Sequence, residues 1–165
     1  MVRAKWLMIV MLAALAGCTS ARQPSAPPDI YVMRHLNTQA GVPDPDLTGD
    51  GQRAAVDLVA WFRTRSKPAV IYVSSTRRAQ QTAAPLAQSL GIAPKIYNPS
   101  DTPGLVAAVA GETGNVLVVG HSNTVPDIIG LLGGQRPVPL VHEDFGDIWL
   151  LSGSPRETER FKIAG

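Results

Sequence analysis

Short apolar runs alternate along this chain with amphipathic stripes of helical spacing. Four runs of four apolar residues have the length of strands, at 30–33, 70–73, 116–119 and 148–151. They lack polar alternation, which is typical of strands covered on both faces, as in a parallel sheet. The stripes between them fall within 55–62, 83–90, 105–109 and 125–132. This alternation predicts a three-layer α/β/α sandwich with a mostly parallel sheet and right-handed crossovers.

Shorter signals mark the element ends. Thr48 is suited to cap the first helix, and Gly91 is suited to end the second in a left-handed conformation. A brief strand is expected at Lys95–Tyr97. The turn sequence "SGSP" at 152–155 predicts a final edge strand near 158–163.

The first residues are typical of an export signal. Arg3 and Lys5 precede an apolar run at 6–16, which is too short to span a bilayer comfortably. The run leads into "LAGC", which ends in Cys18, and this cysteine has no second cysteine to pair with. An ordinary cleaved signal or an uncleaved anchor, with Cys18 an idle thiol, would also fit.

"LAGC" resembles the lipobox of bacterial lipoproteins. The resemblance implies cleavage after Gly17 and a diacylglycerol anchor on the Cys18 sulfur, at the periplasmic side of the cell envelope. Thr19 rather than Asp at the next position favours the outer membrane as the location of the anchored protein. The expected division is a signal at 1–17, a tether at 18–28 and one domain at 29–165.

The charge balance gives no reason to expect a nucleic-acid partner. The whole chain has 15 Lys and Arg against 13 Asp and Glu, and removal of Arg3 and Lys5 with the signal leaves 13 against 13. A domain with no net charge and no basic run lacks the electrostatic footprint of a nucleic-acid binder.

We expect the protein to be a monomer and to act without a cofactor.

Polar residues follow three of the predicted strands. Arg34 and His35 come after the first, Arg77 and Arg78 lie beyond the second, and His121 follows the third. The carboxyl ends of parallel strands share one edge, where open α/β sheets bind ligands. Arginine suits phosphate oxygens, and histidine can act as a covalent nucleophile. The sequence therefore predicts a cationic phosphoryl site at this edge.

Three motifs, "MRHLNT", "SSTRRAQQTA" and "VVGHSNT", resemble those of the histidine phosphatase superfamily, the phosphoglycerate-mutase-like phosphatases. The similarity extends over about residues 29–151. It implies that His35 is the nucleophile that becomes phosphohistidine, without a metal. It also implies that Arg34, Arg78 and His121 bind the phosphoryl group. Arg78 rather than Arg77 fits the family spacing.

The sequence departs from the family beside these motifs. Leu36 stands where Gly or Ala is usual, and Asn37 where Glu is common. Ser122 stands where acid-phosphatase relatives have Asp. We expect Asn37 and Ser122 to contact substrate. Asp101 is the favoured proton donor because it follows the Lys95–Tyr97 strand, although it is also suited to cap a helix.

The sequence thus predicts an envelope-anchored phosphatase for phosphate monoesters, acting on a phosphorylated small molecule or an envelope phosphate ester. Two alternatives stay open. A degenerate relative could bind a phosphorylated partner without turnover. Alternatively, "VLVVGHSNT" resembles the nucleophile elbow of an α/β-hydrolase, with Ser122 as the nucleophile of an esterase. Thr124 replaces the final Gly of that motif.

Overall fold

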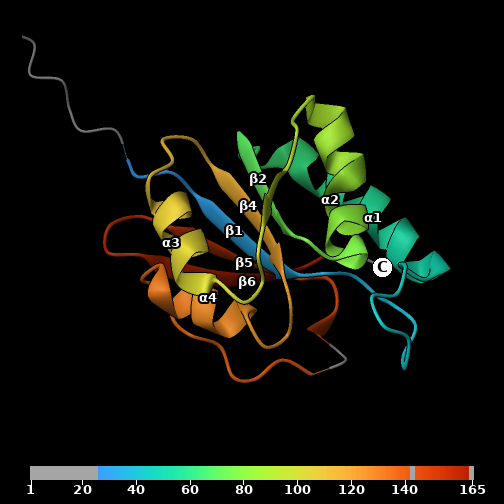
Figure 1. Ribbon diagram of the computed structural model, residues 1–165. Helices are drawn as coiled ribbons and strands as arrows, with labels where there is room; N and C mark the ends of the chain where they lie inside the picture. Colours follow the sequence, from blue (N-terminus) through green and yellow to red (C-terminus); the bar gives the residue numbers. More distant parts are fainter. Residues whose placement is uncertain (1–25, 142–143, 164–165) are drawn as a thin grey trace, which may run out of the picture.

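Six strands form one sheet with helices on both faces (Figure 1) in the computed structural model, which describes residues 26–141 and 144–163. The strands are β1 (Ile30–Arg34), β2 (Val70–Ser74), β3 (Lys95–Tyr97), β4 (Val116–Gly120), β5 (Asp147–Ser152) and β6 (Glu157–Lys162). The predicted α/β/α sandwich is confirmed. All six strands lie at or within a few residues of the stretches that the sequence predicts.

The sheet has the order β3-β2-β4-β1-β5-β6. β3, β2, β4 and β1 run parallel to one another, as predicted. β5 pairs antiparallel with β1, and β6 pairs antiparallel with β5. As a result, β5 starts at the edge where β1 ends.

Right-handed connections decide which face each helix covers. The chain moves outward from β1 to β2 to β3 and then returns to β4, so that helices on the outward and return paths lie on opposite faces. α1 (Gly49–Trp61) and α2 (Arg77–Leu90) cover one face, and α3 (Thr102–Ala110) and α4 (Val125–Leu131) cover the other (Figure 1). A short 3₁₀ turn, Phe62–Thr64, extends α1.

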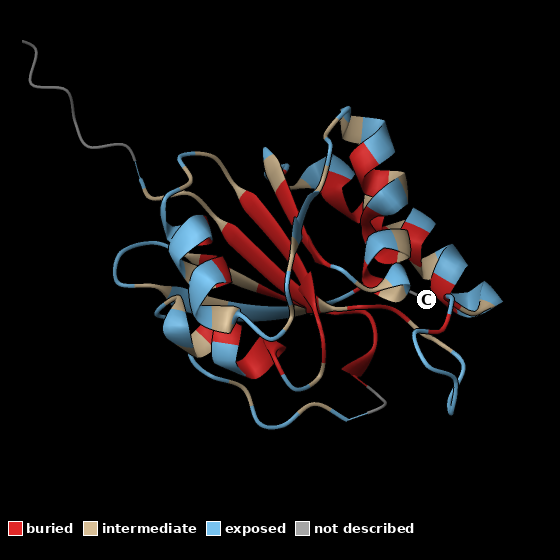
Figure 2. Cartoon of the chain, in the orientation of Figure 1, coloured by how far each residue is buried: buried red, intermediate tan, exposed pale blue. Residues whose placement is uncertain are grey.

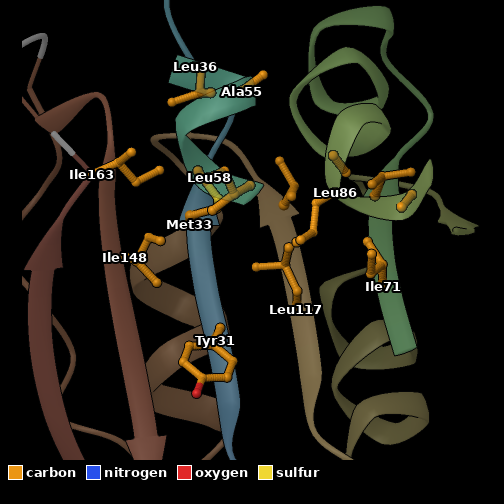
Figure 3. Packing of buried hydrophobic residues seen from close by; sticks show 14 of the residues in the cluster. Tyr31, Met33, Leu36, Ala55, Leu58, Ile71, Leu86, Leu117, Ile148 and Ile163 are labelled. Carbon is orange, nitrogen blue, oxygen red and sulfur yellow. The ribbon is translucent and has the colours of Figure 1, made fainter. Parts of the chain in front are cut away.

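Alternate residues of each central strand pack into two separate cores. Tyr31 and Met33 of β1 face α1 and α2, whereas Ile30 and Val32 face the opposite layer. The Tyr31 ring meets the Phe62 ring edge-on at 5.0 Å between centroids. Figure 3 labels Tyr31 and Met33 among the residues of this core. The middles of β1 and β4 are buried throughout (Figure 2). Burial on both faces explains why these strands read as unbroken apolar runs.

β1 and β4 form the point at which the topology switches. They are neighbours, but the chain leaves β1 towards α1 on one face and leaves β4 towards α4 on the other. The His35 N–H donates to the Gly120 carbonyl at 2.9 Å, which extends the pairing to the last residues of both strands. In open α/β sheets ligands bind at such a switch point, outside the carboxyl ends of the strands.

The described chain enters the domain at the opposite edge. The Asp29 N–H donates to Asn115 Oδ1 at 2.9 Å, and Arg156 Nη1 donates to the Pro28 carbonyl at 2.7 Å. These contacts fix the chain just before β1 begins. The predicted signal, Cys18 and the tether up to residue 25 lie outside the described residues. Within the described part, no helix has the length and apolar character needed to cross a bilayer.

The first turn of α1 is packed tightly against the loop that carries the end of β1. Thr48 caps the helix, since its Oγ1 accepts from the Gly51 N–H at 3.2 Å. The Thr48 N–H donates to the Asn37 carbonyl at 2.9 Å. A Cβ added to Gly51 would lie 2.4 Å from that carbonyl oxygen, which leaves room for glycine alone.

Gly51→Ala is therefore expected to lower the free energy of unfolding by about 1–3 kcal/mol through overpacking, although alanine normally favours a helix. Gly49→Ala is the control, because its Cβ would meet only the flexible Arg53 Nη1 at 3.6 Å. Urea denaturation of both variants checks the difference. Equal effects of the two substitutions would contradict the packing argument.

Candidate active site

Four side chains predicted to converge do so at the carboxyl edge of the sheet: Arg34, His35, Arg78 and His121. We call them the carboxyl-edge cluster. Arg34 ends β1, Arg78 lies in the first turn of α2, and His121 follows β4. The rings of His35 and His121 lie 5.3 Å apart between centroids, and Arg78 Nη2 lies 3.4 Å from His121 Nδ1. The structure thus brings together residues from three separate segments.

The hydrogen bonding of His35 defines its tautomer. Its Nδ1 lies 2.9 Å from the Leu36 carbonyl oxygen, which can only accept, so Nδ1 carries the proton. Burial lowers the pKa of His35 to about 4, and the neighbouring His121 and arginines act in the same direction, against the Leu36 hydrogen bond. The ring is therefore neutral at pH 7 and has its lone pair on Nε2. Nε2 has no hydrogen-bond partner among residues 26–141 and 144–163.

His121 is held from three sides. Its Nε2 lies 2.8 Å from Ser74 Oγ, and its backbone N–H donates to Thr124 Oγ1 at 3.0 Å. Nδ1 accepts from Arg78, which places the ring proton on Nε2 when the ring is neutral. Burial lowers the pKa of His121 to about 4, Arg78 and Arg34 add to this, and Asp44 opposes it.

Arg34 is fixed by the segment that leads into β5. Its Cζ lies 3.8 Å from the centre of the Phe145 ring, and its Nη1 donates to the Val141 carbonyl at 3.0 Å. Burial lowers the pKa of Arg34, and Arg78 contributes in the same direction while Asp144 opposes it. Arg34 Nε is buried without a hydrogen-bond partner in the described part of the chain. Such an orphan donor is unusual away from functional sites.

Arg78 receives its position from α2 and from a loop carboxylate. Its Nη1 donates to Asp44 Oδ1 at 3.2 Å. Thr82, one turn later, ties α2 to the end of β1, because its Oγ1 donates to the Arg78 carbonyl at 2.8 Å and accepts from the Leu36 N–H at 3.0 Å. The nucleophile candidate and the arginine are thereby held on one rigid unit.

The residues predicted to contact substrate lie at different places. Asn37 lines a cavity of about 670 Å³ together with Leu36, Phe145 and residues of α1, and none of the four cluster residues lines it. Ser122 is half-buried directly after His121. It has no hydrogen bond to a histidine in the described parts of the chain, so that the contacts of an esterase dyad are not found there.

The structure does not join Asp101 to the cluster. Its Oδ1 accepts from the Gly104 N–H at 2.9 Å and caps α3, as the alternative interpretation of this residue expected. None of its contacts between described residues reaches His35, His121 or either arginine. Among the described residues, Asp44 is the carboxylate that contacts the cluster.

Two residues that contact the cluster, Asp44 and Phe145, are not among the site residues predicted from the sequence. Phe145 reaches Arg34 because the antiparallel β5 starts at the carboxyl edge. Among the residues that the structure describes, no group of three His, Cys, Asp or Glu side chains is placed to hold a metal ion.

Comparison with known proteins gives one family match. Residues 30–99 match the model of the histidine phosphatase superfamily (branch 1), and this range includes Arg34, His35 and Arg78. The predicted resemblance to this superfamily is confirmed, for a short single-domain chain. No curated protein matches the sequence.

Solved structures of phosphatases have the same fold. A protein assigned as the phosphohistidine phosphatase SixA from Nakamurella multipartitia is 24% identical, with a TM-score of 0.59, over 84% of this chain and 97% of that one. A protein histidine phosphatase SixA bound to tungstate is 17% identical, with a TM-score of 0.60, over 82% and 96%. A mycobacterial glucosyl-3-phosphoglycerate phosphatase with inorganic phosphate is 18% identical, with a TM-score of 0.62, over 84% and 98%. At these identities the likeness establishes the fold.

The lowered pKa of both histidines predicts a pH dependence of stability. Each has a pKa of about 4 in the folded state and an ordinary value of 6.5 in the unfolded state. Between these values the unfolded chain binds more protons, so stability falls as the pH is lowered from 6.5 towards 4. Each histidine contributes a slope of at most about 1.4 kcal/mol per pH unit.

Thermal melts between pH 7 and 5 test this, since ordinary carboxylates titrate mostly below that range. Between pH 7 and pH 5, the Tm of the double variant His35→Asn, His121→Asn is expected to fall less than the Tm of the wild type. An unchanged pH dependence in the variant would show that neither ring is kept neutral by folding.

Proposed function

We propose that this chain is a phosphatase that hydrolyses phosphate monoesters through a phosphohistidine intermediate on His35. The observation that carries the proposal is the state of His35, whose Nδ1 proton is engaged by Leu36 while Nε2 is left with a lone pair beside Arg34, Arg78 and His121. A neutral imidazole among cations is suited to attack an anionic phosphoryl group.

In the first step His35 Nε2 attacks phosphorus and the ester oxygen leaves with the P–O bonding electrons. Arg34 and Arg78 neutralise the charge on the phosphoryl oxygens. His121 would donate to one of these oxygens through Nδ1 once the dianion has replaced Arg78 as its neighbour. This requires a proton on Nδ1, and a bound anion favours the protonated ring.

In the second step water attacks phosphorus, the N–P bond breaks, and its electrons return to Nε2. Hydrolysis restores the neutral ring and releases inorganic phosphate. Because the contacts of Asp101 are those of a helix cap, we do not assign it as the donor to the leaving group. Esters whose alcohol leaves readily as an anion, such as p-nitrophenyl phosphate, are therefore suitable substrates.

We assign a phosphate monoester, either a phosphorylated small molecule or an envelope phosphate ester, as the substrate class, because the cluster recognises the phosphoryl group itself. The cavity that Asn37 lines is bordered by Leu36 and Phe145 but by no residue of the carboxyl-edge cluster, so we do not assign it to the leaving group. The two arginines supply the positive charge, and the activity needs no added metal.

His35→Ala is expected to reduce kcat for p-nitrophenyl phosphate by at least about a thousandfold, because the nucleophile is lost. Ser122→Ala is the matched control next to the other histidine, and it is expected to keep kcat within about fivefold of wild type. Activity is measured with and without a chelator. A wild type that binds phosphate without turnover would favour the degenerate binding protein, and loss of activity in Ser122→Ala alone would favour the esterase.

We also propose that Cys18 anchors the domain to the envelope through lipid. The fold supports a tether on this side, because the chain enters at Pro28 and Asp29, on the edge of the sheet opposite the carboxyl-edge cluster. A site directed away from the bilayer suits substrates in the periplasm. Phosphate esters of the envelope that extend away from the bilayer would also reach it.

Cys18→Ala is expected to abolish incorporation of labelled palmitate and to move the protein from the membrane to the soluble fraction. The wild type expressed in a bacterium with a lipoprotein pathway is the reference. Equal labelling and equal fractionation of both proteins would rule out the anchor.

A further inference from the structure

Asp44 has an unusual backbone conformation, and its side chain contacts the N-terminal turn of α2. It has a positive φ of 43°, a conformation that few residues other than glycine, asparagine and aspartate adopt readily. Both carboxylate oxygens accept from the Arg77 N–H, at 3.0 and 3.2 Å. Thr76 stands at the cap position but makes no capping bond, since its hydroxyl lies 3.0 Å from Ser74 Oγ. Asp44 thus replaces the missing cap from a distant loop.

The same carboxylate also binds Arg78, whose two terminal nitrogens have different partners. Nη1 donates to Asp44 Oδ1 at 3.2 Å, and Nη2 lies 3.4 Å from His121 Nδ1. A polar chain therefore runs from Asp44 through Arg78 and His121 to Ser74. One side of the arginine is held by the loop, and the other faces the second histidine.

We propose that Asp44 is a positioning residue that fixes Arg78 so that Nη2 is presented to the phosphoryl group. This inference rests on the proposed function and adds a residue to it. Arginine has a flexible side chain, and a partner that holds its rotamer in the free protein reduces the entropy lost on binding. The negative charge of Asp44 by itself would repel an anion. Positioning and repulsion therefore predict opposite effects when the charge is removed.

Asp46 offers a matched control on the same loop. Its Oδ1 accepts from Gln81 Nε2 at 2.6 Å, and it forms an ion pair with Arg77. It thus joins the same loop to the same helix as Asp44 does, but it has no contact with Arg78 among the described residues. A substitution there disturbs loop docking and leaves the guanidinium of Arg78 in place.

The experiment measures the Kd of inorganic phosphate by calorimetry, and kcat and KM for p-nitrophenyl phosphate, at constant ionic strength. Asp44→Asn keeps the shape, tolerates the positive φ and retains an acceptor for the Arg77 N–H. It is expected to raise the phosphate Kd about tenfold and to raise KM while kcat falls, whereas Asp46→Asn stays within about twofold of wild type. In an Arg78→Ala background, Asp44→Asn is expected to change the Kd less than about twofold.

Tighter or unchanged phosphate binding in Asp44→Asn would overturn the proposal, as would equal weakening by Asp46→Asn. Thermal melts establish that each variant is folded. Should Asp44→Asn fail to fold, Asp44→Gly, which adopts the positive φ without strain, takes its place. A wild type that binds phosphate but turns over no ester refutes the proposed function while the phosphate Kd still tests Asp44. A wild type that binds no phosphate refutes both.

Discussion

The parallel pairing of β4 with β1 on one side and β2 on the other is the constraint on which the site depends. These strands are buried on both faces, so their polar residues can lie only at their ends. The register sets Arg34 opposite Gly120 and thereby brings His35 beside His121. Because the chain leaves β1 and β4 towards opposite faces, the space outside these two ends is left to side chains rather than to backbone.

The cores that hold the strands also set the chemistry of the site. Burial is the largest cause of the lowered pKa at His35, His121 and Arg34. The protein therefore keeps two neutral imidazoles next to two guanidinium groups, of which only Arg78 has a direct carboxylate partner in the described contacts of the cluster. An anionic ligand compensates this charge better than water does in a buried place. A phosphoryl group has both the charge and the oxygen geometry that two arginines bind.

The sequence allowed the strands, the helices and the four cluster residues to be predicted, because their signals are local. An apolar run, a cap such as Thr48 and a polar pair after a strand can each be recognised without knowledge of the rest of the chain. Phe145 could not be found in this way, since the run at 148–151 contains no information about strand direction. Asp44 acts through a loop conformation with positive φ and a contact 34 residues away, neither of which has a local pattern. By sequence, Asp101 is suited both to cap a helix and to act as an acid, and its hydrogen bond with the Gly104 N–H is the contact of a helix cap.

The central claim is that Arg34, His35, Arg78 and His121 surround one phosphoryl group, with His35 in line to attack it. A crystal structure of the protein with orthovanadate, which mimics the pentacoordinate phosphorus of the transition state, tests this most directly. The account predicts vanadium bonded to His35 Nε2, with its oxygens contacted by both arginines and by His121. Vanadate bound at another place, or in this site with His35 Nε2 turned away from the metal, would contradict it.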